Sequence, residues 1–362
     1  MKSVKRFKKS VVFFLPRYHT NLVGITEYFL KKKIDIKILS TEKKKIENYL
    51  FSKPVLIPKI NINIFFFKFY FLNLFKIKKL LKKNKFDLAI IRLHNFNFDI
   101  FLPIFLKFFT DVKFVFYSQV DLNYYLKLNL LKRIKYFFFL NFFNSKIVTP
   151  VFNINRIKIN KYFIPFPFLL KMKKQVILRT KYIKILTIGK FQERKNLLLL
   201  IKVLEKIKIN YKLIIIGEKS DNAHNFTFMN IKNYIGKKKL DKKIDIKFNI
   251  DHNKINKFYN WCDFFVLPST KEPASISPLE ALSFRKAVIC SDNNGIRYYI
   301  KDGVNGYIFR DNDFKSLKKK IIKMFLSYKK INLKLKVHKS IFLNENLLKK
   351  ISKKQSEFKY DF

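Results

Sequence analysis

Two glutamates separated by seven residues, Glu272 and Glu280, have the spacing and context that most suggest chemistry in this chain. The apolar run Phe264–Leu267 precedes them and is typical of a buried strand. The letters SPLE that end at Glu280 fit a capping box, in which Ser277 accepts a backbone amide, Pro278 takes the first helical position and the glutamate reaches back. We therefore expect a helix to begin near Ser277, with its free amides at the carboxyl edge of a parallel sheet, where a diphosphate would dock.

A second group of residues, Gly189, Lys190 and Lys195, follows the apolar run Ile183–Ile188. A glycine lets the backbone turn closely past a ligand. The two lysines could offset the negative charge that builds on a departing diphosphate, and Lys190 would act there as a point charge. In a chain so rich in lysine, each one taken alone is equally well a solvated surface residue. Their spacing after the turn favours the phosphate interpretation.

These segments resemble the signature of the family 4 (group 1) retaining glycosyltransferases. The stretch LPSTKEPASISPLEAL contains the family's LPS strand end, its paired glutamates and its EAL helix, and the strand AVIC follows. The stretch KILTIGKFQERKNLLLLIKVLEKI is similar to the family's first strand, Gly-Arg turn and Lys-Gly helix start, with Lys190 at the arginine position. Together with the path IDIKFNIDHNKINKFYNWCDFFVLPS between them, the resemblance covers about Ile183 to Phe314 continuously.

The resemblance assigns roles to residues around the glutamate pair. In the family the first glutamate holds hydroxyls of the donor sugar, the second holds the nucleotide ribose, and backbone amides between them hold the diphosphate. The family usually has Phe-Gly where this chain has Ala274 and Ser275. The alternative is that Glu280 is only a capping partner and Glu272 a loop carboxylate. The donor-binding candidates are Gly24, Gly189, Lys190, Lys195, Glu272, Ser275, Ile276, Ser277 and Glu280.

The N-terminal half matches the family more loosely. The stretch LPRYHTNLVGITEYFLKKKIDIKILS resembles its first strand, glycine loop and helix, so that Gly24 would approach the donor phosphate or the acceptor. The family commonly has a histidine near the reacting carbon after the strand that ends here near Tyr117, and this chain has Gln119. His94 also follows a strand, although a lone histidine is more often structural. The catalytic candidates are Glu272, Lys190, Lys195, Gln119 and His94.

The acidic triplet Asp311-Asn312-Asp313 has two interpretations. It has the form of the DxD metal motif of the other main glycosyltransferase fold. It also fits the cap and first turn of a helix over Phe314–Met324, where acidic side chains favour the positive helix end. We prefer the cap, because lysines and helix amides would already offset the phosphate charge. We expect no essential metal and no cofactor, the nucleotide sugar being a substrate.

Alternation of short β-branched or aromatic runs with helical patterns predicts an α/β protein with two Rossmann-like domains. The resemblance implies that these domains face a cleft, in the GT-B arrangement. The strands expected in the first domain are Val11–Leu15, Ile34–Leu39, Leu88–Ile91, Lys113–Tyr117 and Lys146–Thr149. Those expected in the second are Ile183–Ile188, Lys212–Ile216, Ile244–Phe248, Phe264–Leu267 and Ala287–Cys290. We expect an acceptor-binding domain over residues 1–175, a donor-binding domain over 176–335, and a helical tail over 336–362 that returns to the first domain, as the family implies. The polar, basic stretch Lys171–Lys181 marks the boundary.

The net charge of +52 would ordinarily indicate a nucleic acid or an anionic membrane as partner. Lysine is spread over every segment and accompanies abundant Phe, Ile and Asn, so we attribute much of the charge to an AT-rich genome and expect no specific nucleic acid. The stretch Ile64–Lys83 mixes apolar residues with lysine at helical spacing. It is either an amphipathic helix on an anionic membrane surface or a crossover helix packed on the sheet. We expect no transmembrane helix, and the two cysteines, Cys262 and Cys290, suggest no disulfide framework.

The resemblance thus predicts sugar transfer, with retention of configuration, from a nucleotide sugar to a saccharide or lipid-linked acceptor in cell-envelope polysaccharide or lipopolysaccharide synthesis. The location would be cytoplasmic, either free or peripheral at the cytoplasmic face of the membrane. Three alternatives stay open. One is a nucleotide-sugar epimerase on the same fold, the second a non-enzymatic basic protein that binds membrane or nucleic acid, and the third an inactive relative.

Overall fold

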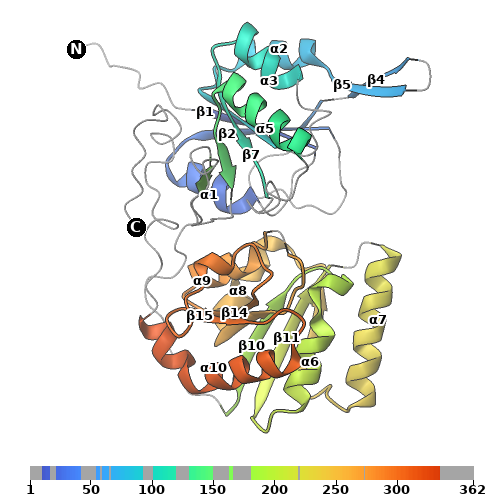
Figure 1. Ribbon diagram of the computed structural model, residues 1–362, viewed down its shortest axis with the longest axis vertical. Coiled ribbons are helices and arrows are strands. Elements are labelled where there is room, and N and C mark those ends of the chain that lie inside the picture. The colour runs from blue at the N-terminus through green and yellow to red at the C-terminus, as the bar shows by residue number, and fades with distance from the viewer. Residues whose placement is uncertain are drawn as a thin grey trace. The chain divides into compact units, whose positions relative to one another are not determined.

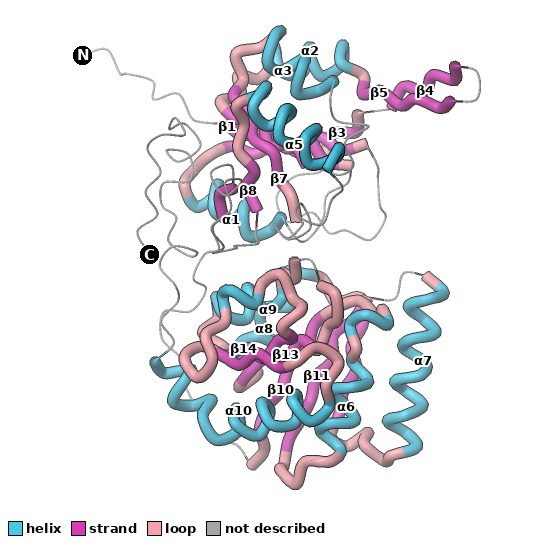
Figure 2. The backbone as a smooth tube through the Cα atoms, in the orientation of Figure 1, coloured by secondary structure: helices cyan, strands magenta, loops and turns pink. Residues whose placement is uncertain are grey.

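The computed structural model describes residues 10–16, 22–41, 54–57, 59–64, 67–92, 101–119, 130–149, 163–165, 181–218, 221–272 and 274–334. These residues belong to two compact units, one formed by the described part up to Pro165 and the other by the part from Lys181 onward (Figures 1 and 2). His94, nearly all of the predicted boundary stretch and the predicted tail lie outside the described residues.

A seven-stranded parallel sheet forms the N-terminal unit, in the order β3-β2-β1-β6-β7-β8-β9. Its strands are β1 (Ser10–Leu15), β2 (Asp35–Ser40), β3 (Val55–Leu56), β6 (Leu88–Arg92), β7 (Lys113–Tyr117), β8 (Ile147–Thr149) and β9 (Phe163–Pro165). Its helices are α1 (Val23–Lys31), α2 (Leu74–Lys83), α3 (Phe101–Phe109) and α5 (Leu130–Phe143). Side chains alternate along β1, so that Val12 and Phe14 join a core with α2, α3 and α5, while Phe13 contacts Phe29 of α1. Both faces of the sheet are therefore covered by helices.

The helix predicted over Ile64–Lys83 is wrong for its first half. An antiparallel hairpin of β4 (Lys59–Ile64) and β5 (Phe67–Leu72) precedes α2. The letters KININI and FKFYFL follow a period of two, which favours strands over a helix. The helix begins only after Asn73, whose side chain accepts a hydrogen bond from the backbone nitrogen of Lys76 at 2.9 Å. The prediction missed this cap and read one helix where there are a hairpin and a helix.

A six-stranded parallel sheet forms the C-terminal unit, in the order β12-β11-β10-β13-β14-β15. Its strands are β10 (Ile183–Ile188), β11 (Tyr211–Gly217), β12 (Ile244–Phe248), β13 (Phe264–Leu267), β14 (Ala287–Ser291) and β15 (Gly306–Phe309). Its helices are α6 (Leu197–Glu205), α7 (Asn222–Lys237), α8 (His252–Trp261), α9 (Ser277–Ser283) and α10 (Phe314–Lys334). All ten predicted strands are present, within a residue or two at each end. The sequence analysis missed β3, β4, β5, β9 and β15, most of which are short.

The strand order of this C-terminal sheet fixes where a site can form. Chain order runs outward from β10 in both directions, through β11 and β12 on one side and through β13, β14 and β15 on the other. The order in which the chain adds strands to the sheet therefore reverses between β10 and β13. The loops that follow these two parallel strands diverge to opposite faces of the sheet. In open parallel sheets such a switch point leaves a crevice at the carboxyl ends of the strands. Residues after Ile188 and after Leu267 are brought together there.

Aromatic side chains hold the helices to both faces of the sheet at β13. Phe264 packs against Phe325 of α10, with ring centroids 5.8 Å apart, and the adjacent Phe265 contacts Tyr259 of α8 on the other face. Cys262 and Cys290 are buried free thiols, as expected, and burial raises the pKa of each to about 12. Neither thiol is available for chemistry at neutral pH.

Candidate active site

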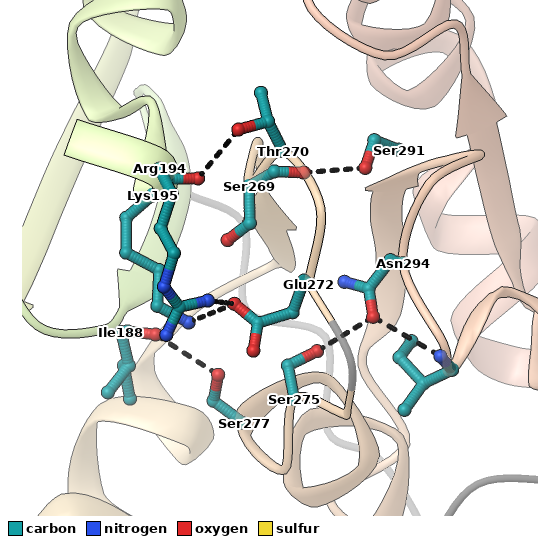
Figure 3. Close-up of polar contacts among 11 residues, drawn as sticks. Ile188, Arg194, Lys195, Ser269, Thr270, Glu272, Ser275, Ser277, Ser291 and Asn294 are labelled. Carbon is teal, nitrogen blue, oxygen red and sulfur yellow. Dashed lines mark hydrogen bonds and ion pairs between the residues drawn. The ribbon is translucent and has the colours of Figure 1, made fainter. Parts of the chain in front are cut away.

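The loops after β10 and β13 meet at the switch point of the C-terminal sheet (Figure 3). The loop after β10 passes Gly189 and forms a single 3-10 turn over Glu193–Lys195. The backbone nitrogen of Thr270, after β13, donates to the carbonyl oxygen of Arg194 at 2.8 Å. This bond holds the two loops together and brings their charged side chains to one place.

The carboxylate of Glu272 is the centre of this group, and the residue is only 6% exposed. The Nζ atom of Lys195 lies 2.5 Å from its Oε2 atom, and the Nη1 atom of Arg194 lies 2.6 Å from the same oxygen. Lys195 is itself buried, and this burial lowers the pKa of its ammonium group, partly opposed by the nearby glutamate. A buried ion pair of Lys195 and Glu272 is therefore joined by a more exposed cation, Arg194, whose side chain is 42% exposed.

Gly189 makes room for the lysine. A Cβ atom at this position would lie 3.3 Å from Cδ of Lys195, tighter than ordinary van der Waals contact. The backbone nitrogen of Gly189 donates to Ile216 at 3.0 Å, which keeps the turn against the sheet. The side chain of Lys195 thus lies over the glycine on its way to the carboxylate, and the predicted turn-and-lysine pair forms one unit.

The loop that carries Glu272 is also tied to the chain after β14. The backbone nitrogen of Glu272 donates to Asn293 at 3.2 Å, and its carbonyl oxygen accepts from the nitrogen of Gly295 at 2.8 Å. The hydroxyl of Ser275 donates to the Oδ1 atom of Asn294 at 3.1 Å. Backbone and side-chain hydrogen bonds thus join the loop after β13, which carries Glu272, to the loop after β14, and these bonds fix the position of the carboxylate.

Glu280 lies in α9 and does not reach back to the helix start. Its Oε1 atom lies 2.8 Å from Nε2 of His252, and its Oε2 atom accepts from the hydroxyl of Tyr259 at 2.7 Å. Burial and the adjacent carboxylate raise the pKa of Tyr259 well above its usual value. The second glutamate is therefore positioned by α8 and not by its own helix.

The predicted capping box is consequently wrong. The helix begins at Ser277 as expected and has Pro278 in its first turn, but its N-cap is the buried Ile276, with no capping side chain. The hydroxyl of Ser277 instead donates to the carbonyl oxygen of Ile188 at 3.0 Å. The serine and the glutamate thus use their hydrogen bonds on β10 and α8, because tertiary partners are within reach of both side chains.

Lys190 pairs with a carboxylate other than Glu272, and the two described N-terminal candidates, Gly24 and Gln119, belong to the other unit. The Nζ atom of Lys190 pairs with Glu218 at 3.0 Å at a partly exposed position. Gly24 is buried in the first turn of α1. Gln119 follows β7, where its Oε1 atom accepts from the Nη2 atom of Arg92 at 3.3 Å. His94 lies outside the described residues, and so the structure gives no position for it.

The acidic triplet at Asp311–Asp313 is a helix cap, as preferred. The Oδ1 atom of Asp313 accepts from the backbone nitrogen of Ser316 at 2.9 Å, and α10 begins at Phe314. Asn312, in the left-handed region at φ 56°, accepts a hydrogen bond from Asn196. Within the described residues there is no group of three His, Cys, Asp or Glu side chains that could hold a metal ion. The expectation that catalysis needs no metal stays a prediction.

Three residues of the site were missed from the sequence. Arg194 is adjacent to the predicted lysine and its charge was visible, but nothing in the spacing shows that it turns toward Glu272. His252 is the first residue of α8, at the carboxyl end of β12, and only the fold brings it to Glu280. Asn294 belongs to the sequence Asn293-Asn294-Gly295, a pattern that indicates a turn but gives no sign that the asparagine takes part in a binding site.

The family comparison agrees with this geometry. The model of the group 1 glycosyl transferases matches residues 170–336, which contain the whole switch-point site, and the model of the glycosyl transferase 4-like domains matches residues 11–100. Together the two matches cover well over half of the chain.

The chain belongs to the group 1 glycosyltransferases.

A curated relative of this glycosyltransferase is an uncharacterised glycosyltransferase of Methanocaldococcus jannaschii, 28% identical over 142 residues. The match covers 38% of this chain and 37% of the relative, so it spans well under half of either protein.

Solved structures share the fold over nearly the whole chain. A glycosyltransferase from Rickettsia africae has a TM-score of 0.67 at 17% identity and covers 95% of this chain and 98% of its own. The protein HepE of Anabaena, solved in complex with UDP, has a TM-score of 0.63 at 12% identity, with 95% and 99% covered. The lipopolysaccharide outer core galactosyltransferase WaaB has a TM-score of 0.60 at 15% identity, with 94% and 99% covered. The fold is therefore GT-B.

Proposed function

We propose that this chain is an active glycosyltransferase that moves a sugar from a nucleotide sugar to a saccharide or lipid-linked acceptor with retention of configuration. The observation that carries the proposal is the group that the buried Glu272 and Lys195 form with the more exposed Arg194 at the switch point of the C-terminal sheet. The relation to HepE, which was solved with UDP, and to WaaB supports a nucleotide-sugar donor and an acceptor from cell-envelope polysaccharide or lipopolysaccharide.

Each residue has a role in this proposal. Lys195 and Arg194 offset the charge of the donor diphosphate as the bond to the sugar breaks, and the burial of Lys195 strengthens its attraction for the diphosphate. Glu272 accepts from sugar hydroxyls, and Glu280, fixed by His252 and Tyr259, accepts from the ribose. Lys190 is a further cation at the edge of the site. The leaving phosphate takes the acceptor proton, so no separate carboxylate base is needed.

A binding and turnover assay tests the proposal. We expect nucleotide sugars to raise the melting temperature of the chain, because a ligand that binds only the folded state stabilises it. Glu272→Gln removes the charge that pairs with two cations, and we expect it to lower kcat/KM for transfer at least about 100-fold. Glu205→Gln is the matched control, since Glu205 pairs with Tyr234 and Lys238 on α6 and α7, away from the site.

Three results would contradict the proposal. The first is an absence of stabilisation by any nucleotide or nucleotide sugar. The second is equal loss in the Glu272 and Glu205 variants. The third is sugar rearrangement or release at full rate without an acceptor, which would identify an epimerase or hydrolase instead.

The proposal includes turnover without a metal ion. Three cations, Lys195, Arg194 and Lys190, face only two carboxylates, Glu272 and Glu218, and the positive charge left over would offset part of the diphosphate charge without a divalent cation. We expect the rate to be the same with excess chelator as with added magnesium or manganese. An absolute requirement for either ion would contradict this part of the proposal.

We also propose that the N-terminal unit attaches peripherally to an anionic membrane at the cytoplasmic face, through the outer face of α2, α3 and α5. Within the described part of the chain, no helix has the length and apolarity to cross a bilayer. The three helices pack on one face of the sheet through a shared core, so their outer surfaces are neighbours (Figure 1). Large apolar side chains on that surface are exposed, Phe138 by 66% and Phe142 by 53%.

The exposed side chains form a continuous apolar stripe on one helix. Leu130, Ile134, Phe138 and Phe142 recur every four residues along α5, and all four are exposed. The stripe continues to α3, where Phe108 lies 6.3 Å from Phe142 between ring centroids. Exposed apolar area of this extent marks an interaction surface in a folded protein.

Charge favours an anionic lipid surface as the partner of this face. The three helices contain five basic residues in α2, one in α3 and three in α5, and none of their residues is acidic. Lys107 lies over the ring of Phe142, with its Nζ atom 4.2 Å from the ring centroid. Aromatic rings that enter the headgroup layer beside lysines are typical of interfacial attachment.

Vesicle sedimentation tests this attachment. We expect the chain to sediment with vesicles of phosphatidylcholine and phosphatidylglycerol, and the double variant Phe138→Ser with Phe142→Ser to lose most of that binding. Phe226→Ser is the control, since Phe226 is 70% exposed on α7 of the other unit. Equal sedimentation of both variants, or binding that does not depend on phosphatidylglycerol, would contradict the assignment of this face.

A further inference from the structure

The buried amide of Asn294 has one end fully paired and the other end unpaired. Its Oδ1 atom accepts from the hydroxyl of Ser275 at 3.1 Å and from the backbone nitrogen of Ile296 at 3.2 Å. Because a carbonyl oxygen has two lone pairs, these two donors settle which end of the amide is oxygen. Its Nδ2 atom has no hydrogen-bond partner among the described residues, although Asn294 is only 1% exposed.

The unpaired nitrogen lies beside Glu272. Residue 294 forms a β-bridge with residue 272, and Figure 3 shows the amide nitrogen of Asn294 turned toward the glutamate. The buried Ser269 lies across Glu272 from Asn294, and its hydroxyl also lacks a partner among the described residues. On Glu272 both cations contact Oε2, and within the described part of the chain no group donates to Oε1. Three polar atoms in the neighbourhood of Glu272 are thus left without a hydrogen-bond partner among the described residues.

These three atoms are complementary to a polyhydroxylated ligand. An amide nitrogen only donates, a carboxylate oxygen only accepts, and a serine hydroxyl does both. A sugar hydroxyl also does both, so one hydroxyl can accept from Asn294 while it donates to Glu272. A buried donor without an acceptor is unfavourable, which gives a ligand that supplies the acceptor an advantage over one that does not.

We propose that Asn294 positions the donor sugar, with its Nδ2 atom donating to a sugar hydroxyl that Glu272 accepts from in turn. This inference rests on the proposed function for its ligand class and adds a residue that selects a hydroxylated sugar over its deoxy analogue. Asn294 touches the sugar and not the nucleotide, so its effect is confined to the sugar part of the donor.

Calorimetric titration with two ligands separates that effect from general damage. The probes are the nucleotide sugar among UDP-glucose, UDP-galactose, UDP-N-acetylglucosamine and GDP-mannose that stabilises the chain most, and its own nucleoside diphosphate. We expect Asn294→Ala to weaken binding of the nucleotide sugar about tenfold, the loss of one hydrogen bond, and to leave the nucleoside diphosphate within about twofold. Asn294→Asp weakens the nucleotide sugar at least as much, because a second carboxylate would stand beside Glu272.

Asn305 supplies the matched control. It is a buried asparagine of the same unit whose Oδ1 atom accepts from the backbone nitrogen of Lys301 and whose Nδ2 atom donates to Tyr299, both at 2.8 Å. We expect Asn305→Ala to lower the melting temperature without changing the ratio of the two affinities. A donor lacking the contacted hydroxyl should bind the wild type and Asn294→Ala equally.

Two outcomes overturn the inference. One is that Asn294→Ala weakens the sugar nucleotide and the nucleoside diphosphate by the same factor, or weakens neither. The other is that Asn305→Ala changes the affinity ratio as much as Asn294→Ala does. The proposed function can fail separately, by binding of donors without any transfer to an acceptor, and that result leaves the affinity ratio measurable. Absence of binding by all four nucleotide sugars would overturn both.

Discussion

At the scale of single residues, the site contains a buried charged group, the ammonium of Lys195, whose removal from water costs free energy. Removing an ammonium ion from water is unfavourable unless an opposite charge and hydrogen bonds replace the solvent. Lys195 receives that compensation from Glu272, whose carboxylate is shared with Arg194. A diphosphate that enters this place meets one cation, Lys195, whose solvent has already been removed, and a second, Arg194, whose side chain is still 42% exposed.

The lowered pKa of Lys195 gives a pH prediction. Above the pKa of the folded state the ammonium becomes a neutral amine, so we expect kcat/KM to fall with rising pH before the usual lysine value of 10.5 is reached. Lys195→Arg keeps the charge at any accessible pH, and its alkaline limb should move upward or vanish. A pH profile of kcat/KM for both proteins checks this, and identical alkaline limbs would count against it.

Stability should change in the opposite direction over the same pH window. The unfolded state binds more protons at this lysine than the folded state between the lowered folded pKa and the unfolded value. The free energy of unfolding contributed by Lys195 therefore rises with pH across that window, while activity falls. Urea unfolding of the wild type and of Lys195→Arg at several pH values across this range measures the free energy of unfolding of each protein. The rise with pH that Lys195 causes should be absent from the variant.

At the scale of elements, close packing between strands restricts which residues can stand at some positions outside the candidate site. Gly306, the first residue of β15, lies opposite Val288 of β14 in the parallel pairing. A Cβ atom at Gly306 would lie 2.0 Å from the carbonyl oxygen of Val288, which is a backbone atom that cannot rotate away. Gly236, in α7, has nothing within 4 Å of the same ideal Cβ position. These two glycines are required to very different degrees.

Alanine at each glycine should act in opposite directions. We expect Gly306→Ala to lower the free energy of unfolding by about 2–3 kcal/mol, because β14 and β15 must separate locally. Gly236→Ala should raise it by about 0.5–1 kcal/mol, the gain in helix propensity of alanine over glycine. Urea unfolding followed by circular dichroism measures both. A neutral Gly306→Ala would mean that β15 pairs with β14 in another register.

At the scale of the whole molecule, the net charge of +52 accompanies a site for which we propose an anionic ligand. Such a field attracts every polyanion, but the attraction between exposed charges is screened beyond about 8 Å at physiological salt. In the proposed site, donor binding would rest in part on the buried Lys195, whose charge salt screens much less. As the salt concentration rises, the affinity for non-specific polyanions should therefore fall much more than the affinity for the donor.

Fluorescence anisotropy with duplex DNA tests this separation. We expect two unrelated duplexes to bind equally at low salt and to be released by about 0.3 M salt, since counterion release makes such binding steeply salt-dependent. Nucleoside diphosphate binding, measured in the same buffers, should fall much less. A strong preference for one duplex that persists at high salt would instead support a specific nucleic-acid partner.

The sequence by itself determined the fold class and the local identity of the site. Short β-branched or aromatic runs such as IKILTI and KLIII, between helical patterns, indicated ten strands and hence parallel α/β units, because each run is continuous in the chain. The paired glutamates and the turn with its lysine were identified for the same reason: each motif is short and continuous.

Tertiary structure alone decided which of those residues meet. Lys195 and Glu272 are 77 residues apart, and His252 and Glu280 are 28 apart, and only the sheet order brings each pair together. The same order turned Ser277 and Glu280 away from the capping box that their spacing predicted. The spacing of residues along the chain shows which hydrogen bonds a segment can form within itself. Which of the possible hydrogen bonds forms depends also on the partners that tertiary packing brings close.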